Sequence, residues 1–351
     1  MSEIQVAIIS TGNSISLTNL KSGNSIKTFK QKSSMIAIFK NIIISTYFNK
    51  MTVQSLNSNL NFTFSIPEQL VCATTSNLLY VGASDSGRVY IWFVNTGQMA
   101  CWFDAHYGKV TCLAFSNCQS YLLTGGNDGL IHSWLISDLL ENTVKPARTF
   151  NHNLCITGIQ LSTSPISRAV LYSSSKDKVF KKFDFNTGLE ISSIVMKRMI
   201  TCFTIDLMQE FGYIGLIDGS IARISLSDFK CVQGFIGHET EVTHLSLSFD
   251  CENLLSSSCS KTILFCTKSR LKLREFVQDT IYSGYYFEFN YIDTAIQPFQ
   301  KFPGFDKWVV GNILVEVDDE VDVDLLIKDR WRLENANRNL YQACVEKFLE
   351  E

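Results

Sequence analysis

The chain has 351 residues, a formal net charge of −3 at pH 7 and 46% hydrophobic residues. The hydrophobic content is ample for a folded core and excludes a mainly disordered chain. The near balance of charge gives no overall basic signal for nucleic-acid binding, and the lack of a run of 18 uncharged apolar residues predicts no membrane-spanning helix.

Short predicted strands group into seven successive units along the chain. The units are expected over about 2–30, 33–60, 68–104, 106–145, 152–193, 197–235 and 238–276. Their strands are bounded by Gly, Asn, Asp and Ser, which are the residues that turns require. The segments 105–134 and 237–266 are the most alike, because each opens on a small residue and His and continues with a Val-Thr strand.

One position of the repeat can be followed through five units. It is occupied by Trp92, Trp134, Phe183, Ile224 and Cys266, at steps of 42, 49, 41 and 42 residues. A period of about 40–45 residues, with His near the start and Trp-Asp chemistry near the end, is typical of a β-propeller blade. The predicted fold is therefore all-β, a seven-bladed WD-repeat β-propeller with a C-terminal α-helical extension.

The first unit lacks a His-led strand before IQVAIIS. A closed ring must then take the missing strand from the far end of the chain, because an unpaired strand edge is a liability. Two segments after residue 276 could supply it, YYFEFNYIDTAI and KWVVGNILVEV. We expect the propeller to span about 1–300 and an acidic connecting segment to follow over 301–321.

The last predicted element is a helix over 322–351, which contains neither Pro nor Gly. Its apolar stripe consists of Leu326, Leu333, Leu340, Ile327, Tyr341 and Phe348. The stripe is interrupted over 334–339, so a long coiled coil is not expected. The helix could pack on its own propeller, pair with a second copy or dock on another subunit. We expect partner binding through Leu326, Leu333, Leu340, Tyr341 and Phe348, with self-association favoured.

The fourth unit contains His106, Thr124, Asp128 and Trp134, a set that also suits a hydroxyl-His-Asp catalytic triad. No Gly-x-Ser-x-Gly motif accompanies it, and in WD-repeat blades the equivalent residues form a buried hydrogen-bonded chain. We expect a structural network and no catalytic residues. In the third unit Ser86 replaces the Asp, and in the seventh Cys266 is taken as the replacement for the Trp.

Cysteine and histidine do not point to a metal or a cofactor. Eleven cysteines are present, an odd number, and no two have Cys-x-x-Cys spacing. With the short strand-like start of the chain, this usage predicts a reducing compartment and no secretory signal. His152 and His238 do not form the close pairs with Cys155 and Cys231 that tetrahedral zinc sites use. We expect no metal site and no cofactor.

A basic stretch follows the third strand of the seventh unit. Lys268, Arg270, Lys272 and Arg274 alternate with other residues, so a strand would place all four on one face. Such a row is either a solvated edge, where charge blocks aggregation, or a contact for RNA phosphate or an acidic partner. The solvated edge is favoured.

The third and fourth units resemble a known family. The segments SGRVYIWFVNTGQM and AHYGKVTCLAFSNCQSYLLTGGNDGLIHSW are similar to the WD-repeat subunit of the rixosome, the family of human WD-repeat protein eighteen. The likeness is sharp over about 80–135, where Ala-His-Tyr stands in place of the common Gly-His. It implies a non-catalytic subunit of a ribosome-assembly complex that acts in large-subunit maturation and in removal of an internal rRNA spacer.

The resemblance also implies partners and a location. Members of the family join a helical-repeat scaffold subunit, often as paired copies through the C-terminal helix, and act near the midasin ATPase on nuclear pre-60S particles. A chromatin or replication role is attached to the family as well. The alternative is a WD-repeat adaptor of another complex, such as a ubiquitin-ligase substrate receptor or a chromatin or transport-coat scaffold. An enzyme is the third class, disfavoured because no catalytic motif is present.

Overall fold

The computed structural model describes residues 4–10, 14–277 apart from 20–21, 23, 31, 34, 40–41, 56–60, 95, 163–165, 249 and 260, and then 287–291, 307–310 and 313–316. The chain divides into two compact units. The first comprises residues 1–136 and 144–293, and the second comprises 137–143 and 294–351. The predicted helix over 322–351 and its apolar stripe lie outside the described residues.

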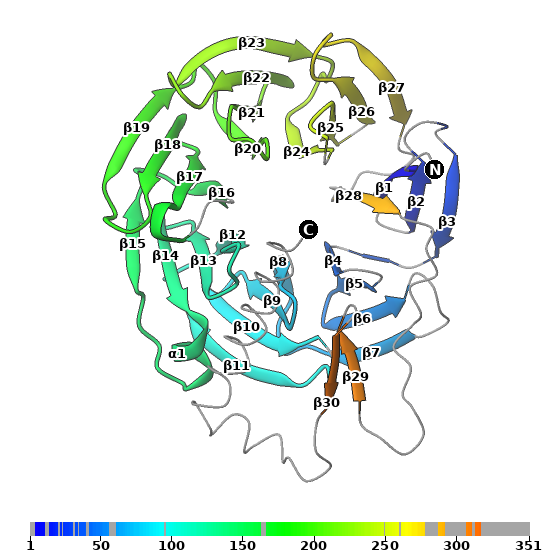
Figure 1. The fold of residues 1–351 in the computed structure, drawn as a ribbon, viewed down its shortest axis with the longest axis vertical. Coiled ribbons are helices and arrows are strands. Elements are labelled where there is room, and N and C mark those ends of the chain that lie inside the picture. The colour runs from blue at the N-terminus through cyan, green and yellow to red at the C-terminus, as the bar shows by residue number, and fades with distance from the viewer. Residues whose placement is uncertain are drawn as a thin grey trace. The chain divides into compact units, whose positions relative to one another are not determined.

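The first unit consists of seven four-stranded antiparallel sheets, which we number 1 to 7 in chain order (Figure 1). Sheet 1 contains β28 (Phe287–Tyr291), β1 (Ile4–Ser10), β2 (Ile15–Asn19) and β3 (Ser25–Phe29). Sheet 2 contains β4 (Met35–Phe39), β5 (Ile42–Tyr47), β6 (Lys50–Ser55) and β7 (Asn61–Ser65). Sheet 3 contains β8 (Leu70–Thr75), β9 (Leu79–Ser84), β10 (Arg88–Phe93) and β11 (Met99–Asp104).

The remaining sheets follow the same order. Sheet 4 contains β12 (Val110–Phe115), β13 (Tyr121–Gly126), β14 (Leu130–Leu135) and β15 (Arg148–Asn151), with α1 (Ile136–Leu140) between the last two. Sheet 5 contains β16 (Ile156–Leu161), β17 (Val170–Ser175), β18 (Val179–Asp184) and β19 (Glu190–Val195), with the 3₁₀ turn η1 (Ile166–Arg168) after β16. Sheet 6 contains β20 (Ile200–Ile205), β21 (Phe211–Leu216), β22 (Ser220–Ser225) and β23 (Lys230–Ile236). Sheet 7 contains β24 (Val242–Leu247), β25 (Asn253–Ser258), β26 (Lys261–Cys266) and β27 (Lys272–Val277).

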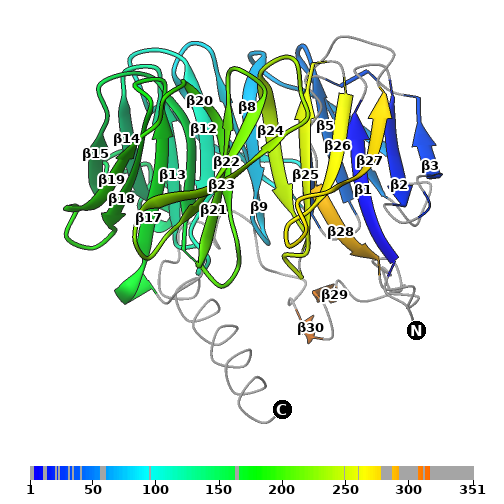
Figure 2. The same cartoon turned by 90° about the horizontal axis from the view of Figure 1, so that it is seen from above.

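The sheets succeed one another around a central axis in a propeller-like arrangement (Figure 1), and Figure 2 shows them from the side. Their first strands lie innermost, where β12 contacts both β8 and β16. In sheets 3 to 7 the second strand is the most buried, as in β9, whose six residues are all buried. The outermost strands alternate between exposed and covered residues, as in β19. The expectation of an all-β fold is confirmed for the described residues.

A threonine at the second position of an inner strand joins neighbouring sheets. The hydroxyl of Thr111 lies 3.0 Å from the carbonyl oxygen of Gly125 in its own sheet and 2.7 Å from that of Ile156 in sheet 5. Thr201 makes the corresponding contacts with the carbonyls of Gly215 and Val242, and therefore links sheets 6 and 7. A hydroxyl that reaches two carbonyls leaves fewer buried backbone oxygens without a donor where the sheets converge.

Sheet 1 takes one strand from the far end of the first unit. β28 pairs antiparallel with β1, with Ile4 opposite Tyr291 and Ile8 opposite Phe287. This strand lies in YYFEFNYIDTAI, the first of the two segments considered from the sequence. The other segment forms β29 (Lys307–Val310) and β30 (Ile313–Glu316), a two-stranded sheet of the second unit.

The sequence repeat is displaced by one residue in sheet 7. The fifth residue of the third strand is Trp134 in sheet 4, and in sheet 7 it is Phe265 and not Cys266. The cause is the hairpin turn, because two residues separate β25 from β26 where three separate β13 from β14. Phe265 is buried in the core that sheet 7 shares with sheet 6. The assignment of Cys266 to the Trp position is therefore wrong.

Candidate functional site

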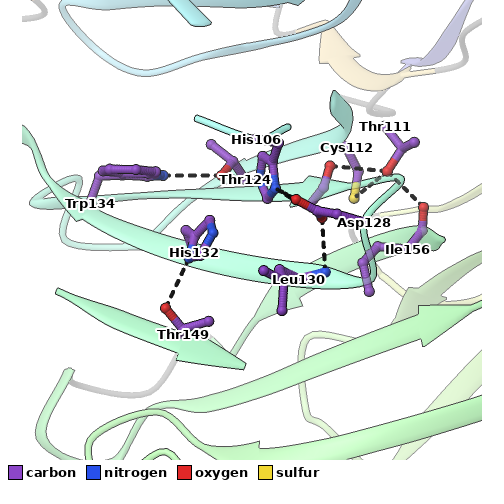
Figure 3. A network of polar contacts seen from close by, with 11 residues as sticks. His106, Thr111, Cys112, Thr124, Asp128, Leu130, His132, Trp134, Thr149 and Ile156 are labelled. Atoms are coloured by element: carbon purple, nitrogen blue, oxygen red, sulfur yellow. Dashed lines mark hydrogen bonds and ion pairs between the residues drawn. The ribbon is translucent and has the colours of Figure 1, made fainter. Parts of the chain in front are cut away.

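A chain of polar side chains crosses sheet 4 (Figure 3). The indole N–H of Trp134 donates to the hydroxyl oxygen of Thr124 at 3.0 Å. The Thr124 hydroxyl lies 2.8 Å from Nε2 of His106, and Nδ1 of His106 lies 3.0 Å from a carboxylate oxygen of Asp128. An indole N–H can only donate a hydrogen bond, and a carboxylate can only accept one. Every hydrogen bond in the series therefore has one donor and one acceptor when Thr124 donates to Nε2 and His106 carries its proton on Nδ1.

This network orders the loops of the fold. The His106 and Thr124 side chains are buried, and Asp128 accepts the backbone N–H of Leu130 at 3.0 Å. The backbone N–H of His106 also donates to the carbonyl of Gly87 at 3.2 Å, so the network ties sheet 4 to sheet 3. A catalytic hydroxyl must reach its substrate, whereas that of Thr124 is enclosed and already bonded on two sides.

Sheets 5 and 7 contain shorter versions of the same network. In sheet 5, His152 lies 2.8 Å from the hydroxyl of Ser173 and 3.2 Å from the carboxylate of Asp177. In sheet 7, His238 lies 2.7 Å from the hydroxyl of Ser256, while its Nδ1 has no partner among the described residues. The shortened turn of sheet 7 supplies no Asp in the position of Asp128. Burial, with Lys261 and Lys272 nearby, lowers the pKa of His238 to about 4.

Sheet 3 replaces the His-Asp pair by a charged cluster that sequence reasoning missed. Ser86 donates to one carboxylate oxygen of Glu68 at 2.6 Å, and Arg88 donates to the other at 2.8 Å. Arg88 also donates through Nε to Asp104 at 3.1 Å. The hydrogen bond from Ser86 is the largest cause of the lowered pKa of Glu68. Two sequence features could have indicated this cluster: Arg88 directly after the Ser-Gly turn, and an acidic residue shortly before β8.

Removing the carboxylate of Asp128 tests the sheet 4 network. Asp128→Ala should lower the free energy of unfolding by about 1–3 kcal/mol, because it leaves the Nδ1–H of His106 and the N–H of Leu130 without acceptors. Asp85→Ala is the matched control, since Asp85 is an exposed turn residue whose ion pair with Lys109 lies at the surface. It should cost less than about 1 kcal/mol. Urea unfolding measures both, and equal losses would contradict the assignment.

The buried histidines predict an acid-sensitive fold. Burial lowers the pKa values of His238 and His244 to about 4, below the value of about 6.5 expected in the unfolded chain. The unfolded chain therefore binds more protons between these pH values, and stability falls as the pH drops from about 6.5 to about 4. His238→Asn should flatten this loss relative to the unchanged protein when unfolding is measured at pH 7, 6 and 5. An unaltered slope would contradict the prediction.

The predicted basic row does not share one strand face. Lys268 and Arg270 lie in the turn before β27, where Arg270 has a left-handed φ of 63°, and only Lys272 and Arg274 lie in the strand. Lys268 forms an ion pair with Glu252 at 2.5 Å, and Lys272 pairs with Glu275. The expectation of one continuous face is wrong, because the chain turns within the basic stretch.

Within the described ranges, no group of three or more His, Cys, Asp or Glu side chains is arranged to hold a metal ion. The described helices include none of the length and apolar character that crossing a membrane requires. The predicted association residues Leu326, Leu333, Leu340, Tyr341 and Phe348 lie outside the described part of the chain.

Comparison with known proteins assigns the class of fold. The family described as "WD domain, G-beta repeat" matches residues 97–134 and 229–265. A chain in a crystal structure of the mitotic checkpoint complex superposes with a TM-score of 0.63 at 15% identity, over 72% of this chain and 81% of that one. The fold is therefore an all-β, WD40 propeller-like fold with seven four-stranded sheets.

Relatives give a more particular likeness. The chain is 34% identical to Pre-rRNA-processing protein IPI3 of Meyerozyma guilliermondii over 42% of its length, and 26% identical to Pre-rRNA-processing protein crb3/ipi3 of Schizosaccharomyces pombe over 74%. It is 32% identical to WD repeat-containing protein 18 of Bos taurus over 56%. The matches cover 34%, 71% and 50% of these relatives, so the chain spans about half the length of the curated relatives it matches. The resemblance to the WD-repeat protein eighteen family is confirmed.

Proposed function

We propose that this chain is a non-catalytic scaffold subunit of a ribosome-assembly complex, acting in pre-60S maturation and in processing of the internal rRNA spacer. The observation that carries the proposal is the likeness to proteins named for pre-rRNA processing, which in one case extends over 74% of the chain. The enclosed hydroxyl of Thr124 supports a structural role for its network. A WD40 propeller-like fold is a rigid support for partner proteins and suits a scaffold.

The proposal includes an architecture and a set of partners. The propeller would be a closed seven-bladed ring over about 1–300, followed by a connecting segment over 301–321 and an association helix over 322–351. The pairing of β28 with β1 supports the closed ring. The partners would be a helical-repeat subunit of the rixosome, the midasin ATPase and the pre-60S particle, in the nucleus.

Affinity purification from cells of the source organism tests this function. The tagged full-length protein should recover large-subunit precursor rRNA and a helical-repeat partner from a nuclear extract. A tagged unrelated propeller protein is the control for nonspecific recovery of abundant ribosomal material. Recovery of a cullin ligase or a vesicle-coat complex without precursor rRNA would contradict the proposal and support the adaptor alternative.

Deleting residues 322–351 should abolish self-association while the propeller stays folded. The expectation rests on the apolar stripe of the sequence, because a helix with one apolar face must bury it. Light scattering at tens of micromolar should give a dimer for the full chain and a monomer for the truncated one. Leu333→Asp should act like the deletion, and Asn335→Ala, in the segment that interrupts the stripe, should not. A full-length monomer would contradict the expectation.

A further inference from the structure

The outer rim of sheet 3 holds an exposed aromatic surface that none of the assignments above uses. It is formed where β10 and β11 run along the outside of the ring (Figure 1). A cavity of about 220 Å³ opens there, lined by Pro67, Arg88, Tyr90, Met99 and Trp102. We call these five residues the Trp102 surface. Trp102 is 51% exposed, whereas the residues directly before and after it in β11 are buried.

The polar groups of the Trp102 surface are held in place before any partner arrives. The guanidinium of Arg88 lies 5.4 Å from the centre of the Trp102 ring, and it is fixed from two sides by Glu68 and Asp104. The His106 and His152 side chains of sheets 4 and 5 are fully buried, whereas the Arg88 side chain is 42% exposed. A preorganised group loses less conformational entropy on binding.

The composition of the surface indicates a protein segment as its occupant. Trp, Tyr, Arg and Met are the residues enriched at protein interfaces, and the first three dominate binding energy. A volume of about 220 Å³ falls below the ~300–1,000 Å³ usual for small-molecule sites. The cavity therefore suits one large apolar side chain.

The charges around the cavity favour a positively charged residue next to the inserted side chain. Arg88 is shared between two carboxylates, so the group of Glu68, Arg88 and Asp104 has a net charge of −1. Asp104 is the most exposed of the three, with 73% of its side chain accessible. A Lys or Arg next to the inserted apolar side chain would neutralise this negative charge. An RNA phosphate would be repelled, because it is negatively charged as well.

We propose that the Trp102 surface is a docking site for a protein segment that inserts one large apolar side chain and places an adjacent Lys or Arg against Asp104. The inference goes beyond the ribosomal role and does not depend on it. The proposed partner contributes a linear segment that binds at the rim of sheet 3, and this binding is independent of the predicted C-terminal helix.

A random dodecapeptide phage library, panned on the full-length protein and depleted on the Trp102→Ala variant, supplies the probe. Enriched peptides should share a large apolar residue next to Lys or Arg. Their binding, measured by fluorescence polarisation, should weaken at least about tenfold in Trp102→Ala. Ile236→Ala is the matched control, because Ile236 is an apolar residue on the edge strand of sheet 6 and is 87% exposed. It should bind as the unchanged protein does.

A charge exchange separates docking from a general loss of structure. Asp104→Lys should weaken the selected peptides, and changing the peptide's own Lys or Arg to Glu should restore binding to that variant. Thermal melting should show that Trp102→Ala and Asp104→Lys remain folded. Failure to enrich any peptide over Trp102→Ala, enrichment of acidic peptides, or absence of the charge rescue would overturn the proposal. So would Trp102-dependent binding of a labelled 12-nucleotide oligouridylate in place of peptide.

Discussion

Trp134→Ala should lower the free energy of unfolding by about 3–5 kcal/mol, because it removes a large buried ring and one hydrogen-bond donor. The side chain is 3% exposed, packs on Phe103 of sheet 3 with ring centres 4.8 Å apart, and donates to Thr124. The cavity would therefore open at the junction of two sheets. Chemical denaturation followed by tryptophan fluorescence and circular dichroism measures the loss.

Trp134→Phe separates the ring from its N–H group. Phenylalanine stands in the same strand position in sheets 5 and 7, as Phe183 and Phe265, so the fold accepts it there. The Thr124 oxygen keeps its contact with His106 when the indole is lost. The cost should therefore be about 1–2 kcal/mol. If Trp134→Ala costs less than about 1 kcal/mol, the network does not support the sheet.

Gly87→Ala should destabilise the protein by about 3 kcal/mol or more. Gly87 has a φ of 94°, which costs a non-glycine residue about 1–2 kcal/mol, and a Cβ atom there would lie 2.1 Å from the carbonyl oxygen of His106. That backbone cannot easily move, because the N–H groups of Ala105 and His106 both bond the carbonyl of Gly87. A shift would loosen the hydrogen bonds between sheets 3 and 4 and add to the conformational cost.

Two other glycines supply matched controls for the Gly87 variant. Gly188 has a φ of 77° with no heavy atom within 4 Å of a Cβ, so Gly188→Ala should cost only the conformational part, about 1–2 kcal/mol. Gly108 has neither a left-handed φ nor a close neighbour, so Gly108→Ala should stay within about 0.5 kcal/mol of the unchanged protein. Equal losses at Gly87 and Gly188 would show that the close approach to His106 does not matter.

The repeat made most of the sheets predictable from the sequence. The turns around Asp128, Asp177 and Asp218 mark one hairpin in each of three units, and the Val-Thr pairs mark the first strand of two units. The period failed in sheet 7, where the turn before Lys261 is one residue shorter. The spacing of the repeat places each sheet in the sequence to within a residue or two. One missing turn residue, however, shifts every later residue of that sheet by one repeat position.

Other features could not be read from the pattern because they depend on contacts distant in the sequence. Two segments alternate suitably to pair with the first strand, and only the structure distinguishes Phe287–Tyr291 from the other. The cluster of Glu68, Arg88 and Asp104 brings together charges from β10, β11 and the loop between β7 and β8, and none of them occupies a recognised repeat position. The Lys268 turn was mistaken for strand because alternating charge resembles strand periodicity.

Depletion of this protein in its source cells, followed by hybridisation analysis of precursor rRNA, tests the proposed ribosomal role most directly. The account predicts that large-subunit precursors retaining the internal spacer accumulate within a few generations, while small-subunit rRNA matures normally. The unchanged gene should restore processing, and so should the Trp102→Ala variant if peptide docking is a separate activity. Normal removal of the spacer in fully depleted cells would contradict the account.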